Sequence, residues 1–160
     1  MNRLWAPWRM TYVGGSSAAG GCIFCTALAA RDDAKYLILQ RTSRAFLILN
    51  AYPYTPGHLM AVINRHVGTL AEAGVEELAD AMSLAGLATG ALTEEYRAEG
   101  FNIGVNQGRV AGAGVEGHLH VHVVPRWNGD SNFMTTVGES RVLPESLEAT
   151  YARLRKRLSG

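Results

Sequence analysis

Three histidines alternate with apolar residues in the run His118-Leu-His120-Val-His122-Val-Val. Side chains of a β-strand point alternately to its two faces, so a strand here would place the three imidazole rings on one face. A buried imidazole needs a hydrogen-bond partner, which makes core filling a poor explanation for three of them. The pattern indicates either a metal site built on His-x-His or a nucleophilic imidazole flanked by helper groups.

A glycine-rich loop precedes this run. It contains Asn106-Gln107-Gly108 and then Gly112 and Gly114. Backbone N–H groups of glycines can approach a phosphate closely because no Cβ stands in the way. A simple turn also explains such loops, so the neighbouring histidines carry the interpretation.

The chain has two cysteines, Cys22 and Cys25, with two residues between them. In a reducing compartment this spacing favours metal ligation or redox chemistry over a structural disulfide. Two buried thiols without a ligand are the alternative.

Short β-rich runs and a long helix must position these groups. The predicted strands cover residues 36–39, 45–49, 58–63, 101–106 and 118–124. A short helix should follow Cys25 and reach Asp32 or Asp33, and a last helix should begin near Pro144 and end in the basic segment 153–157. Grouped strands with one central helix predict an α+β fold with an antiparallel sheet.

The long helix, about residues 75–98, is predicted to be apolar on two sides. One side carries Val75, Leu78, Ala79, Met82, Ala85, Leu92 and Tyr96, and the other carries Leu84, Leu87, Ala88 and Ala91. Such a helix needs two partners, for example its own sheet and a second subunit.

The bulk properties indicate one domain. The chain has 160 residues, 48% of them hydrophobic, and a net charge of +1 without a long run of one sign, which argues against a nucleic-acid or membrane partner. Residues 1–21 are predicted to be an aromatic arm, with Trp5 and Trp8, on a flexible linker, and residues 22–160 a single domain. Since no signal peptide or spanning segment is recognisable, a cytoplasmic location is expected.

The histidine run resembles the signature of the histidine triad family of nucleotide hydrolases and transferases, His-φ-His-φ-His-φ-φ with φ an apolar residue. Residues 118–124 fit it at every position. The resemblance extends to Asn50, Pro56-Gly57-His58, Arg65-His66 and Asn106-Gln107-Gly108. The segment 124–133 and the N-terminal Trp-Ala-Pro-Trp-Arg are similar to a bacterial branch related to dinucleoside polyphosphate hydrolases and diadenosine tetraphosphate phosphorylases.

The resemblance implies that His120 is a nucleophile that forms a nucleotidyl-imidazole intermediate at an α-phosphate. His122 would assist the leaving phosphate, and His58 or a backbone carbonyl would fix which ring nitrogen attacks. Gln107 and the backbone of Gly114 would contact the reacting phosphate.

Two further features follow from the same resemblance. Asn50 matches a position that contacts ribose, and the run 46–49 could form one wall of an adenine pocket. Many family members have Ser or Gln near Gly114 and Val115, and this chain has neither, which leaves hydrolysis and phosphorolysis as open alternatives. Trp127, Asp130 and Asn132 could contact the distal part of a dinucleotide, although such a polar segment with a glycine is more often a plain surface turn.

The cysteines acquire a role in this setting. Together with His66 and His118 they offer two sulfurs and two nitrogens, a set that suits tetrahedral Zn²⁺ and that some bacterial relatives use for a structural zinc. A homodimer is also expected. The alternatives are a nucleoside phosphoramidate hydrolase that uses the same His120, a nucleotide-binding regulator without turnover, and a metal-dependent hydrolase or dioxygenase. The last lacks an acidic ligand at a suitable spacing.

Overall fold

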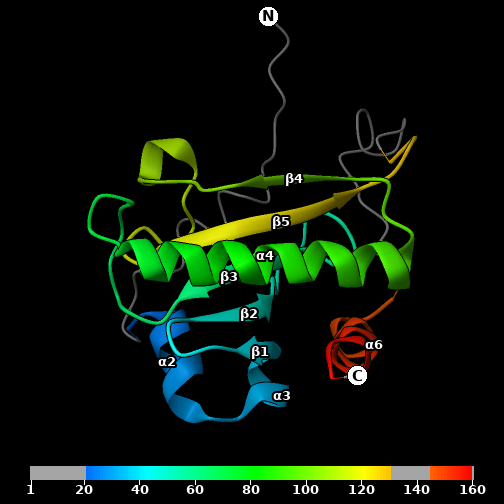
Figure 1. Ribbon diagram of the computed structural model, residues 1–160, viewed down its shortest axis with the longest axis horizontal. Helices are drawn as coiled ribbons and strands as arrows, with labels where there is room; N and C mark the ends of the chain where they lie inside the picture. Colours follow the sequence, from blue (N-terminus) through cyan, green and yellow to red (C-terminus); the bar gives the residue numbers. More distant parts are fainter. Residues whose placement is uncertain (1–20, 131–144, 160) are drawn as a thin grey trace, which may run out of the picture.

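The computed structural model describes residues 21–130 and 145–159. At its centre lies a five-stranded antiparallel sheet with the strand order β1-β2-β3-β5-β4 (Figure 1). The strands are β1 (Ile38–Arg41), β2 (Ala45–Leu49), β3 (Leu59–Ile63), β4 (Gly100–Gly104) and β5 (His120–Arg126). The predicted α+β class with an antiparallel sheet is confirmed, and the bounds of β2 agree with the prediction. The predicted arm at residues 1–20 lies outside the described residues.

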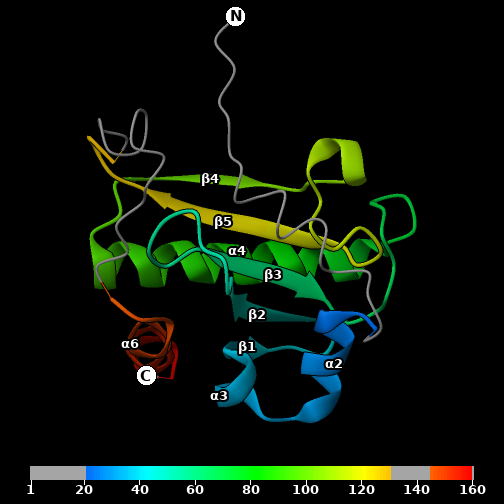
Figure 2. The ribbon, with the colours of Figure 1, turned by 180° about the vertical axis from the view of Figure 1, so that it is seen from behind.

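Helices cover both faces of the sheet. They are α2 (Ile23–Ala30), α3 (Asp33–Tyr36), α4 (Val75–Tyr96) and α6 (Leu147–Leu158), with a 3₁₀ turn η1 (Arg109–Ala111). Helix α4 crosses in front of the sheet in Figure 1 and behind it in the reversed view of Figure 2, where α2 comes to the front. Within residues 21–130 and 145–159, no helix combines the length and the apolarity that a bilayer crossing requires.

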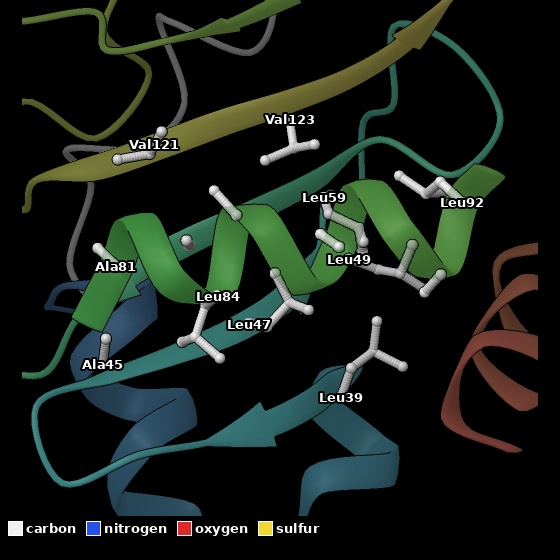
Figure 3. Packing of buried hydrophobic residues seen from close by; sticks show 14 of the residues in the cluster. Leu39, Ala45, Leu47, Leu49, Leu59, Ala81, Leu84, Leu92, Val121 and Val123 are labelled. Carbon is white, nitrogen blue, oxygen red and sulfur yellow. The ribbon is translucent and has the colours of Figure 1, made fainter. Parts of the chain in front are cut away.

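The larger core fills the space between α4 and the sheet (Figure 3). Leucines and valines of the strands face alanines and leucines of the helix: Leu39, Leu47, Leu49, Leu59, Val121 and Val123 against Ala81, Leu84, Ala88 and Leu92. A smaller cluster on the opposite face contains Phe24, Ala27, Ile38, Phe46, Ile48, Met60 and Val62. Alternation along β2 therefore sends Leu47 and Leu49 towards α4, and Phe46 and Ile48 towards α2.

Helix α4 has two apolar sides, but their membership differs from the prediction. Leu84, Ala88 and Ala91 are buried, together with Ala85 and Leu92. The exposed apolar side carries Val75, Met82 and Leu87, which are 84%, 52% and 43% exposed. The 3.6-residue period shows which residues share a side of the helix, but the contacts with the sheet decide which of these sides is buried.

Several predicted element starts need correction. The first short helix, expected after Cys25, begins at Ile23 and contains Cys25. The strand expected at residue 36 begins at Ile38, because Asp33–Tyr36 form a helical turn that is capped by Asp32 and ends at Leu37 with φ 60°. The last helix begins at Leu147, because the hydroxyl of Ser146 accepts a hydrogen bond from the N–H of Ala149 and caps it. The predicted start near Pro144 is about one helical turn too early.

The segment that leads into α4 is fixed by one carboxylate. Glu77 Oε2 accepts hydrogen bonds from the Gly74 N–H and from the Arg65 guanidinium, both at 2.7 Å. The Arg65 hydrogen bond is the main reason that the pKa of Glu77 falls to about 2. The charged pair holds the 64–74 loop, which includes His66, against the start of the helix.

Candidate active site and four-ligand cluster

The pairing of β3 with β5 brings His120 and His122 to one face of the sheet, as predicted. His122 lies opposite Met60 and His120 lies opposite Val62, and residues that are directly opposite in an antiparallel pair share a face. The two imidazole centroids are 4.9 Å apart. Both rings therefore lie on the side of the Phe24 cluster, away from α4.

His118 precedes β5, which begins two residues later than predicted, at His120. The N–H of Leu119 donates to the carbonyl of Val67 at 2.7 Å, a bond to the 64–74 loop. The fully buried ring of His118 donates from Nε2 to the carbonyl of Ile63 at 2.7 Å. These bonds tie His118 to the end of β3 and to the 64–74 loop.

The proton of His120 can be placed from its hydrogen bond. Its Nδ1 lies 2.8 Å from the carbonyl oxygen of His118, and because a carbonyl only accepts, Nδ1 carries the proton. Burial lowers the pKa of the ring. His120 is therefore a neutral imidazole whose unprotonated Nε2 is available as a nucleophile.

His58 orients His122 through a second chain of hydrogen bonds. The backbone N–H of Tyr54 donates to His58 Nδ1 at 3.1 Å, so the proton of a neutral His58 must be on Nε2. His58 Nε2 lies 3.0 Å from His122 Nδ1 and donates to it. The remaining nitrogen of a neutral His122, Nε2, then carries a proton and can act as a donor.

The turn before β3 supports this series of hydrogen bonds. Buried Asn50 accepts from the Tyr52 N–H at 2.9 Å, and its amide nitrogen lies 3.3 Å from His58 Nδ1. The Tyr54 ring lies 4.5 Å from the His58 ring. Gly57 has φ +76°, and a Cβ there would come 2.6 Å from a Leu92 methyl, so only glycine fits. The ribose contact predicted for Asn50 stays a prediction, and the role of Tyr54 was not predicted because nothing in its spacing indicates it.

The glycine-rich loop returns to the histidine face only in its second half. Gln107 is exposed, and its side-chain oxygen accepts from the Leu70 N–H at 2.9 Å, so this oxygen points to the 64–74 loop. Gly108 has φ +82° and starts the η1 turn. Gly114 is half-buried, and Val115 packs against the Phe24 cluster. The phosphate contacts predicted for Gln107 and Gly114 remain predictions.

The four predicted ligands come together. One ligand atom from each of Cys22, Cys25, His66 and His118 lies within 4.8 Å of all the others. His118 Nδ1 lies 3.2 Å from Cys22 Sγ, 3.5 Å from Cys25 Sγ and 3.3 Å from His66 Nδ1. Both cysteines are free thiols, and burial is the largest of the effects that raise the pKa of Cys25.

The donor chemistry of this cluster fits Zn²⁺. Two sulfurs and two imidazole nitrogens make up a standard closed tetrahedral set. The ring of His118 is prepared for ligation, because its Nε2 proton is engaged by the Ile63 carbonyl and its Nδ1 lone pair faces the thiols.

Phe24, which sequence reasoning missed, joins the two sites. It lies between the cysteines in the sequence and is buried. Its ring centroid lies 5.4 Å from that of His118 and 5.1 Å from that of His120. An apolar residue inside a Cys-x-x-Cys segment was the available signal, since a helical turn between two ligands must face what they bind.

Of the remaining residues predicted to contact substrate, some face the histidines and others do not. Of the predicted adenine wall at 46–49, only Phe46 and Ile48 face the histidines, because strand side chains alternate. Asp130 accepts two hydrogen bonds from Arg126, at 2.5 and 2.8 Å, and Trp127 Nε1 donates to the Tyr96 carbonyl, which favours the surface-turn interpretation. Asn132, Trp5 and Trp8 lie outside the described residues.

Known proteins are similar to this chain in sequence and in fold. The model of the HIT domain matches residues 31–129. An AP-4-A phosphorylase of Mycobacterium tuberculosis is 40% identical over 158 residues, which cover 94% of this chain and 80% of the relative. An adenylylsulfatase of Arabidopsis thaliana is 30% identical over 115 residues, covering 72% of this chain and 57% of the relative. The crystal structure of a zinc-bound histidine triad family protein from Mycobacterium smegmatis superposes with a TM-score of 0.72 at 28% identity, covering 87% of this chain and 94% of that one.

Proposed function

This chain belongs to the HIT-domain family and is an enzyme of that family, and from this premise we propose that it is a phosphorylase of dinucleoside polyphosphates such as diadenosine tetraphosphate. The 40% identity to an AP-4-A phosphorylase supports the substrate class and the use of inorganic phosphate. The observation that carries the chemistry is the hydrogen bond from His120 Nδ1 to the His118 carbonyl, which leaves Nε2 free to attack.

The first step is a displacement at the α-phosphorus. His120 Nε2 forms a P–N bond while the bond from the α-phosphorus to its bridging oxygen breaks, and ATP leaves. The Nε2 proton of His122 moves to, or hydrogen-bonds with, the departing phosphate oxygen. The positive charge on the nucleotidyl-imidazole is stabilised by the His118 carbonyl at Nδ1.

The second step regenerates the enzyme. An oxygen of inorganic phosphate attacks the same phosphorus, a P–O bond forms, and the P–N bond to His120 breaks. The products of the cycle are ATP and ADP. Water in place of phosphate would give ATP and AMP, so the acceptor can be identified from the products.

The test uses purified protein with diadenosine tetraphosphate, with and without inorganic phosphate, and separates the nucleotide products. We expect ADP and ATP only when phosphate is present, and incorporation of labelled phosphate into ADP. AMP and ATP regardless of phosphate would replace phosphorolysis with hydrolysis. Tight binding without any turnover would contradict an enzymatic role on this substrate and support a regulator.

A second substrate class is supported by the state of His122. A nucleoside phosphoramidate releases an amine, which needs a proton to leave, and the His58 hydrogen bond at 3.0 Å leaves His122 with its proton on Nε2. A relative named an adenylylsulfatase also supports testing a substrate that is not a dinucleotide. Adenosine 5′-monophosphoramidate should therefore be assayed beside the dinucleotide, and a higher kcat/KM for the phosphoramidate would reverse the order of the two proposals.

We also propose that Cys22, Cys25, His66 and His118 hold a structural zinc ion. The fit of the four ligand atoms supports it, as does the zinc-bound relative. When bound, zinc supplies a cross-link between α2, the 64–74 loop and the start of β5, and it takes no part in the chemistry at phosphate.

A second copy of this chain is the proposed partner of the exposed side of α4. Val75, Met82 and Leu87 are exposed apolar side chains there, and a Cβ added at the exposed Gly86 would meet nothing within 4 Å, so another backbone could approach closely. We expect light scattering to give the mass of a dimer for the wild type and of a monomer for Leu87→Glu. Lys156→Glu on α6 is the charge-changing control and should remain a dimer; a monomeric wild type would contradict the proposal.

A further inference from the structure

The four-ligand cluster and the nucleophile are connected through a single peptide plane. The carbonyl oxygen of His118 accepts from His120 Nδ1 at 2.8 Å, and the N–H of Leu119 donates to Val67 at 2.7 Å. These two groups belong to one planar peptide unit, so the Val67 contact also sets the direction of the carbonyl that orients His120. Both residues next to this contact, His66 and His118, belong to the cluster.

A second connection runs through α2. The ring of Phe24 lies against the rings of both His118 and His120, with centroids at 5.4 and 5.1 Å. Helix α2 has no side-chain cap and no acidic residue in its first turn, so little in its own sequence fixes that turn. Cys22 and Cys25 flank Phe24, and ligation of the two thiols would determine where its ring lies.

We propose that Phe24 and the peptide unit joining His118 to Leu119 are positioning groups, through which the four-ligand cluster holds the imidazole of His120 in one orientation and one tautomer. The inference rests on the proposed function for the role of His120 and of the bound ion. It gives the cluster a second task beyond stability, because Phe24 on α2 and the His118 carbonyl before β5 both contact the ring of His120.

The two connections constrain different motions of the ring. The His118 carbonyl keeps the proton on Nδ1 and so directs the lone pair of Nε2 away from the strand. Phe24 covers the ring and restricts its rotation about the Cα–Cβ and Cβ–Cγ bonds. The two constraints depend on each other, because a ring that rotates loses the hydrogen bond from Nδ1 to the His118 carbonyl. When either is loosened, His120 exchanges between tautomers and orientations, and the fraction of molecules able to attack falls. A misplacement of this kind lowers the rate of intermediate formation by about 10- to 100-fold.

The experiment reads the ring of His120 directly. Protein labelled with ¹⁵N at histidine is loaded with Zn²⁺, and long-range ¹H–¹⁵N spectra at one fixed pH assign a proton to Nδ1 or Nε2 of each ring. The comparison sample is His66→Asn, which removes one ligand of the cluster. Among the described residues, the His66 side chain has neither a hydrogen bond to His120 nor a ring contact with His120. A second variant, Phe24→Leu, keeps all four ligands. Phe101→Leu is the matched control on the opposite face of the sheet, where Phe101 packs against the α4 core.

We expect the Zn²⁺-loaded wild type and Phe101→Leu to show a single Nδ1–H form of His120. His66→Asn and Phe24→Leu should show averaged tautomers, with a rate of intermediate formation reduced about 10- to 100-fold and a substrate KM changed much less. The same single tautomer in both variants would overturn the proposal. If His66→Asn unfolds, as circular dichroism would reveal, Phe24→Leu decides the question alone, since it retains the ion.

Failure of this inference and failure of the proposed function are distinguishable. The ring spectra require no substrate, so they report on positioning even if diadenosine tetraphosphate is not turned over. Turnover by the wild type with an unperturbed ring in both variants would leave the function intact and remove the positioning role.

Discussion

Replacement of His120 with asparagine is expected to lower kcat for diadenosine tetraphosphate by about 10⁴-fold or more, the scale on which enzymes lose activity when a covalent nucleophile is removed. Asparagine retains a hydrogen-bond donor that can reach the His118 carbonyl, but its amide nitrogen has no lone pair suited to attack at phosphorus. Steady-state turnover under saturating phosphate measures the loss.

Two controls make this result specific to the nucleophile. His120→Asn should bind nucleotide with a Kd close to that of the wild type, and its melting temperature should change little because the buried hydrogen bond is kept. Denaturation of the wild type during turnover should trap a nucleotidyl group on the protein that the variant does not carry. Residual activity above about one per cent, far more than loss of a nucleophile permits, would point to direct attack by phosphate or water.

Removal of the metal is expected to have the largest effect on stability. A ligand present at about 1,000 times its Kd stabilises the folded state by about 4 kcal/mol, and for a domain of this size each kcal/mol shifts the melting temperature by about 2–4 °C. Cys25→Ser should therefore melt roughly 8–16 °C below the Zn²⁺-loaded wild type. Scanning calorimetry together with metal analysis of each sample measures this.

The matched comparison is wild type from which the ion has been removed by a chelator. It should melt close to Cys25→Ser, and re-addition of Zn²⁺ should restore only the wild type. An unchanged melting temperature after chelation, with metal analysis confirming removal, would show that the cluster does not stabilise the fold. Thr26→Ala, one residue further along α2, is a control for a small change in the same exposed turn.

Local patterns in the sequence were sufficient wherever the structure depends on local rules. The bounds of β2 follow from a run of five apolar residues between polar ones, and the shared face of His120 and His122 follows from strand alternation. The four-ligand cluster was predictable because zinc coordination restricts residue types so strongly that few other combinations exist in this chain.

Features that depend on tertiary contacts were not predictable in this way. The hydrogen bond from Leu119 to Val67, which ties the start of β5 to the 64–74 loop, joins residues about fifty apart in the sequence. The orientation of Gln107 towards Leu70 and the contact of Phe24 with His120 are likewise set by how loops and helices pack. An apolar residue inside a Cys-x-x-Cys segment was a signal that Phe24 faces the four-ligand cluster, but a residue-type pattern does not reveal that its ring also contacts His120.

The pairing of Met60 with His122 and of Val62 with His120 also limits how this chain can change in length. Insertion of one residue at the start of β5 would turn the imidazoles that follow it towards α4, and insertion within β3 would turn the side chains that follow it away from them. The 64–74 and 105–117 connections do not have this constraint, because loops accept added residues at a small entropic cost. Insertions and deletions that this chain tolerates should therefore lie in those two loops, and any change in substrate choice that comes from a change in length should arise there. The spacing from His118 to His122 should stay constant.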